Sequence, residues 1–387
     1  MDHRGQPLTD PDGYRALVRI LILNAGSSTL KASVVDHPRR EAVFTTTASW
    51  GADATRATGR TDDLERLLEQ LVVEGVPIGS LEAVGHRVVH GGEHFTQPVV
   101  VDDDVLAALG GVGALAPLHN PVAVDTLRAA LTLLPDVPHI AAFDTAFHAT
   151  LDEPARRYAL PADWVDAHGI RRYGFHGLSV AWSVRRAAEL LAMPAEALGS
   201  VIAHLGSGCS VTAVAGGRSV ATSMGMTPLE GLVMGTRAGS VDPGILLRLL
   251  DAGVPASELA ERLDHESGLL AVGGSADMRE LLERQAAGDT RAGLAVELFV
   301  RRAAEAIAGA ATSLARLDAL VFTAGIGEHA APVRVRIVER LGVLGLGRPL
   351  ADPDGDALLT PRDRRPAVLR IEAREDLVIA EAAATLA

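Results

Sequence analysis

Short apolar runs, Gly/Ser turns and longer amphipathic stretches alternate along the chain. Residues 18–23 form a β-type apolar run, Gly26-Ser27-Ser28 is a turn signal, and residues 30–36 read as a returning strand, which together predict a β-hairpin. A further strand is predicted over residues 319–323. Helical periodicity covers residues 61–73, 122–134, 180–191 and 292–317. Such alternation predicts layered α/β domains.

The hairpin plan occurs a second time in residues 200–214, which again combine an apolar run, a Gly/Ser turn and a returning run. Superposing Gly26 on Gly206 and Ser27 on Ser207 gives an offset of 180 residues, close to half the chain. We therefore predict an internal duplication of a whole domain. Because no low-complexity linker separates the halves, we expect two touching domains with a ligand cleft between them.

Composition narrows the classes of protein that fit. At 387 residues and 48% apolar content, the chain can bury two cores. Its one cysteine, Cys209, favours a reducing, cytoplasmic compartment. The first seventeen residues contain no apolar segment, and no run of about 18 uncharged apolar residues exists, so neither export nor membrane spanning is expected. A net charge of −13 without basic tracts argues against nucleic acid and anionic membranes as partners.

The first Gly/Ser turn is bracketed by two residue types that the chain otherwise nearly lacks. Lys31 is the single lysine among 36 basic residues, and Asn24 is one of two asparagines, with Asn120. Backbone N–H groups of a tight turn can bind phosphate oxygens, and a lysine ammonium adds a compact charge. An ordinary hairpin turn is the alternative, since Gly-Ser turns are common there. P-loop, G-x-G-x-x-G and protein-kinase signatures are absent from the sequence.

Seven motifs, taken in order, resemble the acetate kinase family. They begin at residue 24 and end at residue 328, within a resemblance that covers about residues 18–387. The motifs are Asn24-Ala-Gly-Ser-Ser-Thr-Leu-Lys31, Gly85-His-Arg-Val-Val-His-Gly-Gly92, Ala116-Pro-Leu-His-Asn-Pro121, Phe143-Asp-Thr-Ala-Phe-His148, Tyr173-Gly-Phe-His-Gly-Leu-Ser179, Gly225-Met-Thr-Pro-Leu-Glu-Gly-Leu-Val-Met-Gly-Thr-Arg237 and Phe322-Thr-Ala-Gly-Ile-Gly-Glu328.

The resemblance implies the duplicated, actin-like (ribonuclease H-like) α/β fold that acetate and sugar kinases share with Hsp70 chaperones and actin. On this basis we expect a first domain over residues 18–148, with the last helix, residues 375–387, packed on it. A nucleotide-binding second domain is expected over residues 149–374, and residues 1–17 form an arm outside the resemblance. Members of the family are usually dimeric, so a homodimer is expected.

The activity implied by the resemblance is reversible, Mg²⁺-dependent, direct in-line transfer of a phosphoryl group from ATP to acetate, giving acetyl phosphate and ADP. Two anions must meet in such a reaction, so fixed positive charge has to stabilise the transition state. Arg87 and Arg237 match this need, because guanidinium groups bind carboxylate and phosphoryl oxygens through paired donors. The resemblance adds Asp144, and it adds His176 and His119 as groups that hold the transferring phosphoryl group.

The resemblance also implies which residues contact the acid, the nucleotide and the metal ion. Beside Arg87, the pocket for the acyl methyl group corresponds to Val89, Leu118, Phe175 and Pro228. The nucleotide contacts correspond to Asn24, Ser27, Thr29, Lys31, His204, Gly206, Ser207, Gly208, Asp277, Met278, Arg279, Gly325, Ile326, Gly327 and Glu328. Asn24 and Glu375 are the implied sites for Mg²⁺, or for Mn²⁺ in its place, with Asp144 orienting the metal's waters or substrate groups. Asp376 is the alternative ligand, and a helix-start charge is the alternative role of Glu375.

Four positions depart from the family pattern, and several of them lie on the side of the phosphoryl donor. They are Thr29, Ser207, Ser240 and His329, which stand where the family generally has serine, asparagine, aspartate and asparagine. Another triphosphate or pyrophosphate therefore stays open as the donor. Propionate or butyrate kinase activity is the alternative for the acid. A nucleotide-driven actin-like or Hsp70-like protein without an acid substrate is the alternative of another class.

Overall fold

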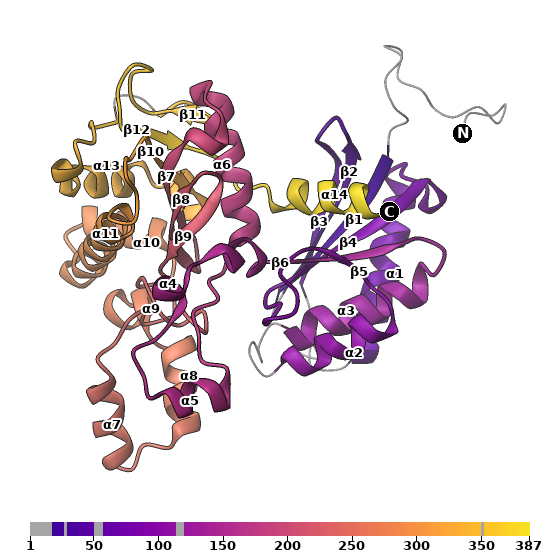
Figure 1. Cartoon of the computed structure of the whole chain (residues 1–387), viewed down its shortest axis with the longest axis horizontal. Helices are drawn as coiled ribbons and strands as arrows, with labels where there is room; N and C mark the ends of the chain where they lie inside the picture. The colour runs from indigo at the N-terminus through magenta and orange to yellow at the C-terminus, as the bar shows by residue number, and fades with distance from the viewer. Residues whose placement is uncertain (1–17, 27–28, 50–56, 114–119, 350–351) are drawn as a thin grey trace. The chain divides into compact units, whose positions relative to one another are not determined.

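The computed structural model describes residues 18–26, 29–49, 57–113, 120–349 and 352–387. The chain divides into two compact units, each with its own sheet (Figure 1). The first unit is Met1–Ala146 with Arg374–Ala387, and the second is Phe147–Ala373. None of the helices in the described part of the chain is long and apolar enough to cross a bilayer.

The first unit contains a six-stranded sheet in the order β3-β2-β1-β4-β6-β5. Its elements are β1 (Val18–Ala25), β2 (Thr29–His37), β3 (Glu41–Ser49), α1 (Ala57–Val73), η1 (Ile78–Ser80), β4 (Leu81–Val88), β5 (Val99–Val100), α2 (Asp103–Val112), α3 (Asn120–Leu133), β6 (His139–Phe143) and α14 (Glu375–Leu386). The strands β1, β4 and β6 are parallel, while β2 pairs with β1 and β3 in an antiparallel meander. The predicted first hairpin is therefore confirmed.

Helices cover both faces of this sheet, which explains why residues 20–23 of the central strand β1 are apolar and buried without alternation. Leu21 and Leu23 pack in one core cluster with Leu64 of α1. Ile22 points to the opposite face of the sheet, which α14 covers. Gly85 of β4 lies on that face, and a Cβ atom there would be 2.5 Å from Ile379 Cγ2 of α14 and 2.9 Å from Ile22 Cδ1. Gly85 thus lets α14 approach β4 closely, and Glu375 at the start of α14 is held at this sheet.

The second unit contains another six-stranded sheet, in the order β11-β12-β10-β7-β8-β9. Its elements are η3 (Ala146–Thr150), which spans the boundary, α4 (Glu153–Arg156), α5 (Ala162–His168), α6 (Gly177–Leu191), η4 (Ala195–Ala197), β7 (Gly199–Leu205), β8 (Cys209–Ala215), β9 (Arg218–Thr222), α7 (Pro243–Asp251), α8 (Ala256–His265), α9 (Gly268–Gly273), α10 (Met278–Ala286), α11 (Thr290–Ala311), β10 (Ala319–Thr323), α12 (Ala324–His329), α13 (Ala331–Arg340), η5 (Gly342–Leu344), β11 (Ala357–Leu358) and β12 (Ala367–Arg370).

Strand for strand, the two sheets have the same topology. In each, an antiparallel meander of three strands is followed by two strands parallel to the first, and a short antiparallel strand forms the far edge. The duplicated α/β fold predicted from the repeated hairpin is confirmed. The two hairpins differ in the length of their turns. Ala25 pairs with Leu30 in the first hairpin, whereas Leu205 pairs with Cys209 in the second, whose turn is one residue shorter. Ser210 therefore occupies, opposite His204, the place that Lys31 occupies opposite Asn24.

One predicted helix ends earlier than its periodicity indicated. The pattern over residues 292–317 predicted a helix to Leu317, but α11 ends at Ala311. Thr312 Oγ1 donates to the Gly309 carbonyl at 2.6 Å, and the backbone N–H groups of Ser313 and Leu314 bond the carbonyls of Ala310 and Ala311 in tight turns. These local bonds satisfy the free carbonyls of the last turn and end the helix.

Candidate functional site

The carboxyl ends of the three parallel strands of the first sheet bring polar side chains to one edge. Asn24 is the second-last residue of β1, Arg87 the second-last of β4, and Asp144 directly follows β6. Glu375 begins α14, which packs on the same strands. Carboxyl ends of parallel strands are the usual location of ligand sites in α/β sheets. We call Asn24, Arg87, Asp144 and Glu375 the Arg87 cluster.

Within the Arg87 cluster, one guanidinium contacts every other member. Its Nε and Nη2 donate to the two carboxylate oxygens of Asp144, at 3.0 and 2.5 Å. Its Nη1 donates to Asn24 Oδ1 at 3.1 Å, and its Nε lies 3.5 Å from Glu375 Oε2. The Asn24 amide also donates to Glu375 Oε2, at 3.5 Å. The cluster is therefore a connected network of charge-assisted hydrogen bonds rather than a set of separate side chains.

Burial makes these charges depend on one another. The Asp144 side chain is 1% exposed, against 18% for Arg87 and 16% for Glu375. Burial lowers the pKa of Arg87, but the carboxylates of Asp144 and Glu375 outweigh it, so this pKa lies above its ordinary value. Burial raises the pKa of Glu375, and Asp144 adds to that effect while Arg87 and Lys31 oppose it. A cation placed near Glu375 and Asp144 would therefore be stabilised.

Two features next to the Arg87 cluster complete this edge. Lys31 pairs with Asn24 in the β1–β2 ladder, and Thr29 begins β2. Directly after β4, Val89 is buried. The buried Asn120 side chain accepts the His90 N–H at 3.0 Å and donates to the His90 carbonyl at 2.8 Å. Asn120 thereby fixes the segment that follows Arg87. The predicted residues Ser27, Leu118 and His119 lie outside the described residues.

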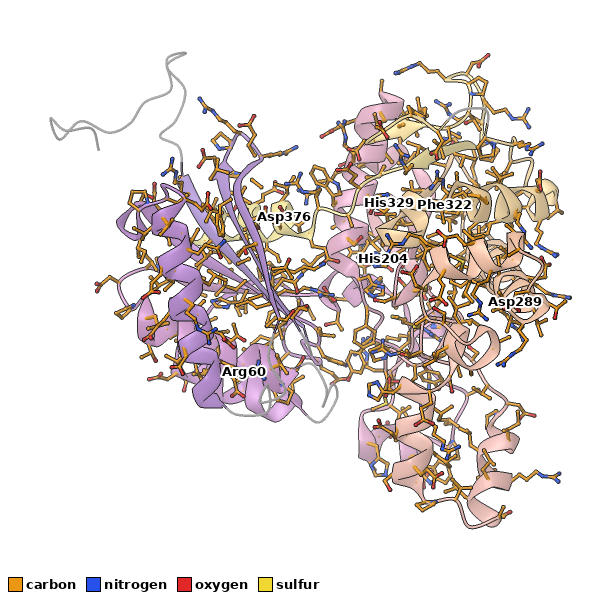
Figure 2. All side chains as sticks on the ribbon, turned by 180° about the vertical axis from the view of Figure 1, so that it is seen from behind. Arg60, His204, Asp289, Phe322, His329 and Asp376 are labelled. Carbon is orange, nitrogen blue, oxygen red and sulfur yellow. The ribbon has the colours of Figure 1, made fainter. Side chains whose placement is uncertain are left out.

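The second unit carries a cluster of imidazoles. The rings of His176 and His204 are stacked, with centroids 4.0 Å apart. His176 Nδ1 is 3.0 Å from Ser210 Oγ, and His204 Nδ1 is 2.9 Å from Ser179 Oγ. Figure 2 labels His204 on β7 and Phe322 on the neighbouring strand β10. We call His176, His204, Ser179 and Ser210 the His176 cluster.

His176 itself has a strained backbone. It precedes α6 with φ 60° and ψ 22°, the left-handed region that non-glycine residues seldom adopt. Its neighbours hold it there: His148 Nε2 bonds the Phe175 carbonyl at 2.9 Å, and a Cβ on Gly174 would lie 2.7 Å from the His148 ring. Strain of this kind persists where surrounding contacts determine it, and it is common at functional sites.

Arg237 is the last residue of the glycine-rich loop of this unit, residues 225–237, and Asp264 orients it. Its Nε donates to Asp264 Oδ1 at 3.0 Å, and the neighbouring Thr236 hydroxyl donates to the Asp264 carbonyl at 2.7 Å. A Cβ on Gly208 would lie 3.4 Å from His176 Nε2 and 3.9 Å from Arg237 Nη1. The second Gly/Ser turn, His176 and Arg237 therefore lie close together, and glycine at position 208 leaves room between them.

The remaining predicted nucleotide residues lie in two other places of the second unit. Asp277 caps α10 and pairs with Arg279 at 3.0 Å, while Met278 is buried. The run Ala324–His329, which directly follows β10, is the short helix α12. The buried Arg334 donates to the carbonyls of Gly327 and Glu328, each at 2.8 Å, and a Cβ on Gly325 would meet no atom within 4 Å. No neighbouring atom covers the Cα of Gly325, and Ile326 follows it.

Within each unit the structure brings together residues that are distant in sequence. The Arg87 cluster unites four predicted residues, and the second unit places predicted His176, His204, Gly208 and Arg237 near one another. Of the predicted acyl pocket, Val89 lies in the first unit, and the buried Phe175 and half-buried Pro228 in the second. Sequence reasoning missed Asp264, Ser179 and Ser210. It noted Asn120 as one of two asparagines but gave it no role.

The two sheets and these clusters define a kinase of the actin-like, two-domain α/β class. The model of the acetokinase family matches residues 19–381, and the chain belongs to that family. An acetate kinase from Deinococcus deserti is 46% identical over 348 residues, which cover 84% of this chain and 86% of that protein. The solved Porphyromonas gingivalis acetate kinase superimposes with a TM-score of 0.87 at 31% identity, covering 95% of this chain and 99% of that one. A propionate kinase from Francisella tularensis gives a TM-score of 0.85 at 34% identity, covering 96% and 100%.

Proposed function

We propose that this protein catalyses reversible transfer of the terminal phosphoryl group of ATP to the carboxylate of acetate. A carboxylate oxygen forms a bond to the phosphorus as the bond to ADP breaks, which gives acetyl phosphate and ADP by direct in-line transfer. The observation that carries the proposal is the Arg87 cluster: a guanidinium with paired donors, held at the carboxyl ends of parallel strands in a chain of the acetokinase family.

Arg87 has the chemistry to recognise an acid or a phosphoryl group. The Nε and Nη2 of Arg87 donate to Asp144, and its Nη1 donates to the Asn24 amide oxygen. The guanidinium is therefore fixed in orientation before a substrate binds. A preorganised cation stabilises a developing negative charge without further reorganisation. We assign Arg87 to binding the carboxylate and phosphoryl oxygens, and Asp144 to holding Arg87 in place and orienting polar groups of the substrate.

His176 and Arg237 are assigned to the transferring phosphoryl group. Arg237 has its Nη1 on the side of Gly208, and its Nε donates to Asp264. The His176 ring is oriented through Nδ1 by Ser210, which leaves Nε2 on the Gly208 side. Both groups can donate to equatorial phosphoryl oxygens, where charge is spread in the transition state.

The Arg87 cluster also fits a magnesium ion. Its donor atoms are two neighbouring carboxylates and an amide oxygen, the hard oxygen ligands that Mg²⁺ prefers, and burial with Asp144 raises the pKa of Glu375. In the described part of the chain, no three His, Cys, Asp or Glu side chains form a complete metal cage. That suits Mg²⁺, which takes one or two carboxylates and completes its shell with waters and phosphates. We assign the ion to Glu375 and Asn24, and when bound it would neutralise charge on the donor phosphates.

Acetate is proposed as the acid because Val89 is buried and β-branched, and so cannot swing aside for an extra methylene. Propionate is the second candidate, since the superimposable Francisella tularensis protein is a propionate kinase. For the donor we propose ATP, with Lys31, Gly206, Gly208 and Gly325 on the nucleotide side. Another triphosphate or pyrophosphate is the alternative that Ser207, Ser240 and His329 leave open.

We further propose a cytoplasmic homodimer that binds neither nucleic acid nor membranes. The support for a second copy is α7, on which Ile245, Leu247, Leu249 and Leu250 are all exposed and no residue is buried. A helix with this many exposed apolar side chains is normally covered by a partner. In sedimentation, Leu247→Glu with Leu250→Glu should give monomers, whereas Val343→Glu, at an exposed apolar residue of η5, should not. Dimers in both variants would move the interface elsewhere.

The proposed reaction is tested by trapping acyl phosphate as the hydroxamate. Purified protein is incubated with acetate, propionate or butyrate and with ATP, GTP or pyrophosphate, with and without Mg²⁺. We expect hydroxamate with acetate and ATP only when Mg²⁺ is present. Hydrolysis of ATP without acyl phosphate from any acid would instead indicate a nucleotide-driven protein of the same fold.

A further inference from the structure

Glu230, inside the glycine-rich loop of the second unit, has partners on both of its carboxylate oxygens. The Tyr158 hydroxyl donates to Oε2, and Arg172 Nη2 donates to Oε1 at 2.7 Å. The Tyr158 oxygen in turn accepts the backbone N–H of Met226 at 3.1 Å. We call Tyr158, Arg172 and Glu230 the Glu230 cluster.

Arg172 joins this cluster to the backbone of the loop. Its Nη1 donates to the carbonyls of Ser223 and Met224, at 3.2 and 2.9 Å, and its guanidinium stacks on the Tyr158 ring at 5.2 Å from the centroid. Both side chains of the Arg172–Glu230 ion pair are partly buried, at 18% and 34% exposed. Such a pair is screened less by solvent than a surface pair, and it fixes geometry through several bonds at once.

The backbone at Gly225 is built around the same cluster. A Cβ there would lie 1.9 Å from Glu230 Oε2 and 2.0 Å from the Tyr158 hydroxyl, so any other residue would displace these two groups. The Gly225 carbonyl accepts the N–H groups of Tyr173 and Gly174, at 3.1 and 3.3 Å. The segment 223–230 and the segment 172–174 are therefore tied to each other by side chains and by backbone.

Each of these segments leads into a residue assigned to the acid or to the phosphoryl group. Pro228 lies between Gly225, which packs against the Glu230 cluster, and Glu230, which is part of it. Phe175 and His176 directly follow Gly174, whose N–H bonds Gly225. The position of Pro228 relative to Phe175 thus depends on bonds that neither residue makes itself.

We propose that Glu230 is a positioning residue that sets the size of acid the enzyme accepts, by holding the Pro228 segment against the Phe175 segment. The proposal rests on the proposed function, and it assigns acid selectivity in part to residues that do not touch the acid. Losing the Glu230 carboxylate should let the two segments separate and admit a longer acyl chain. Nucleotide binding should be spared, because Asp277 and Arg279 lie at the start of α10 and Gly325 lies in α12, outside the two segments that the cluster joins.

The test is kcat and KM for acetate, propionate and ATP in wild type, Glu230→Ala, Glu230→Gln and Tyr158→Phe. For Glu230→Ala we expect acetate KM to rise about tenfold and the propionate-to-acetate ratio of kcat/KM to rise at least about threefold, with ATP KM within about twofold of wild type. Glu230→Gln can still accept a hydrogen bond from Arg172, so its acetate KM and acid ratio should lie between those of wild type and Glu230→Ala. Tyr158→Phe removes only the hydroxyl oxygen and tests the cluster if the alanine variant does not fold. Glu305→Ala breaks an exposed glutamate–arginine pair on α11 and serves as the matched control.

The outcomes separate the two proposals. If wild type makes acyl phosphate but Tyr158→Phe and the folded Glu230 variants keep its acetate KM and acid ratio, the cluster has only a structural role and the inference is wrong. A rise in ATP KM equal to that for acetate would likewise overturn it, because the effect would not be confined to the acid. If wild type makes no acyl phosphate from any acid, the proposed function fails and this inference fails with it.

Discussion

The imidazole rings of His176 and His204 lie face to face, with planes 17° apart and centroids 4.0 Å apart, and each Nδ1 is bonded to a serine hydroxyl. His204 stacks on one face of the His176 ring, and Ser210 is bonded to the Nδ1 atom of that ring. The left-handed backbone of His176 adds a third constraint. The orientation of His176 therefore depends on its contacts with His204 and Ser210 and on its own backbone conformation.

We expect His176→Ala to lower kcat by about 10²- to 10³-fold, as removal of one preorganised donor does in other enzymes. Ser210→Ala should lower kcat by only about three- to tenfold, since the imidazole remains but is less well oriented. Steady-state kinetics on acetate and ATP measures both. Equal losses in the two variants would mean that Ser210 acts on the substrate directly.

Replacing either candidate arginine by alanine should lower turnover by about 10²-fold or more while the protein stays folded, because each removes charge that stabilises the transition state. Circular dichroism and thermal melts serve as the folding check. Arg87→Ala also leaves Asp144 and Glu375 without their cation, so its melting temperature should fall further than that of Arg237→Ala. Near wild-type turnover in either variant would contradict its assigned role.

Two adjacent acids at the start of α14 can be told apart through metal dependence. Glu375 belongs to the Arg87 cluster. Asp376 is labelled in Figure 2, and both of its carboxylate oxygens accept from Arg374, each at 3.0 Å. Glu375→Ala should raise the Mg²⁺ concentration for half-maximal activity by about tenfold or more, and Asp376→Ala should change it little. Mg²⁺ titrations at saturating ATP and acetate decide the point. The reverse order would move the ligand by one residue.

For the acid, we expect wild type to prefer acetate over propionate, with butyrate the poorest substrate. Val89→Ala should raise propionate relative to acetate by up to about tenfold, mainly through KM, because one methylene in an apolar pocket changes binding by an amount of this size. The measurement is kcat/KM for both acids in both proteins. A wild-type preference for propionate, or an unchanged ratio in the variant, would place acid selection away from Val89.

A buried pair of histidines should make folding sensitive to acid. His86 Nε2 lies 3.0 Å from His139 Nδ1, and His139 Nε2 lies 3.0 Å from the Leu134 carbonyl. Burial, together with His139, lowers the pKa of His86 well below 6.5, and burial lowers the pKa of His139. The unfolded chain therefore takes up protons near pH 6.5 that the folded chain does not, so stability is full above this pH and is lost as pH falls below it.

Urea unfolding between pH 7.5 and 5 measures this effect, with a slope of up to about 1.4 kcal/mol per pH unit for each histidine. His86→Gln should flatten the slope, even though its stability at pH 7.5 is lower. His168→Gln, at an exposed residue of α5, should leave the slope as in wild type. A wild-type slope that His86→Gln does not change would assign the acid sensitivity to other groups.

Local pattern was sufficient to predict the class of fold. The duplicated hairpin and the strand at Ala319–Thr323 follow from short-range apolar periodicity and turn residues, and the structure confirms them. The last helix was expected from the family resemblance, and it is α14. The end of α11 was missed because it is decided by the bonds of Thr312 and its neighbours rather than by the apolar spacing.

The contacts within the candidate site could not be predicted in the same way. Asn24 and Glu375 are 351 positions apart and meet only because α14 packs on β1 and β4. The pairing of Arg237 with Asp264 depends on how α8 ends, and no motif marks it. Family resemblance supplied residue names, whereas partners such as Asp264, Ser210 and Asn120 required a folded backbone.

The membership of α14 in the first unit has a consequence for synthesis on the ribosome. The second unit, Phe147–Ala373, is one continuous stretch and can fold as soon as it has emerged. The first sheet is made earlier, but the helix that covers the face of Ile22 and Gly85, and that carries Glu375, is translated only after the whole second unit. The nascent first unit thus has an uncovered apolar face for the time that more than half of the chain is being translated, and this is the interval in which it would need a chaperone.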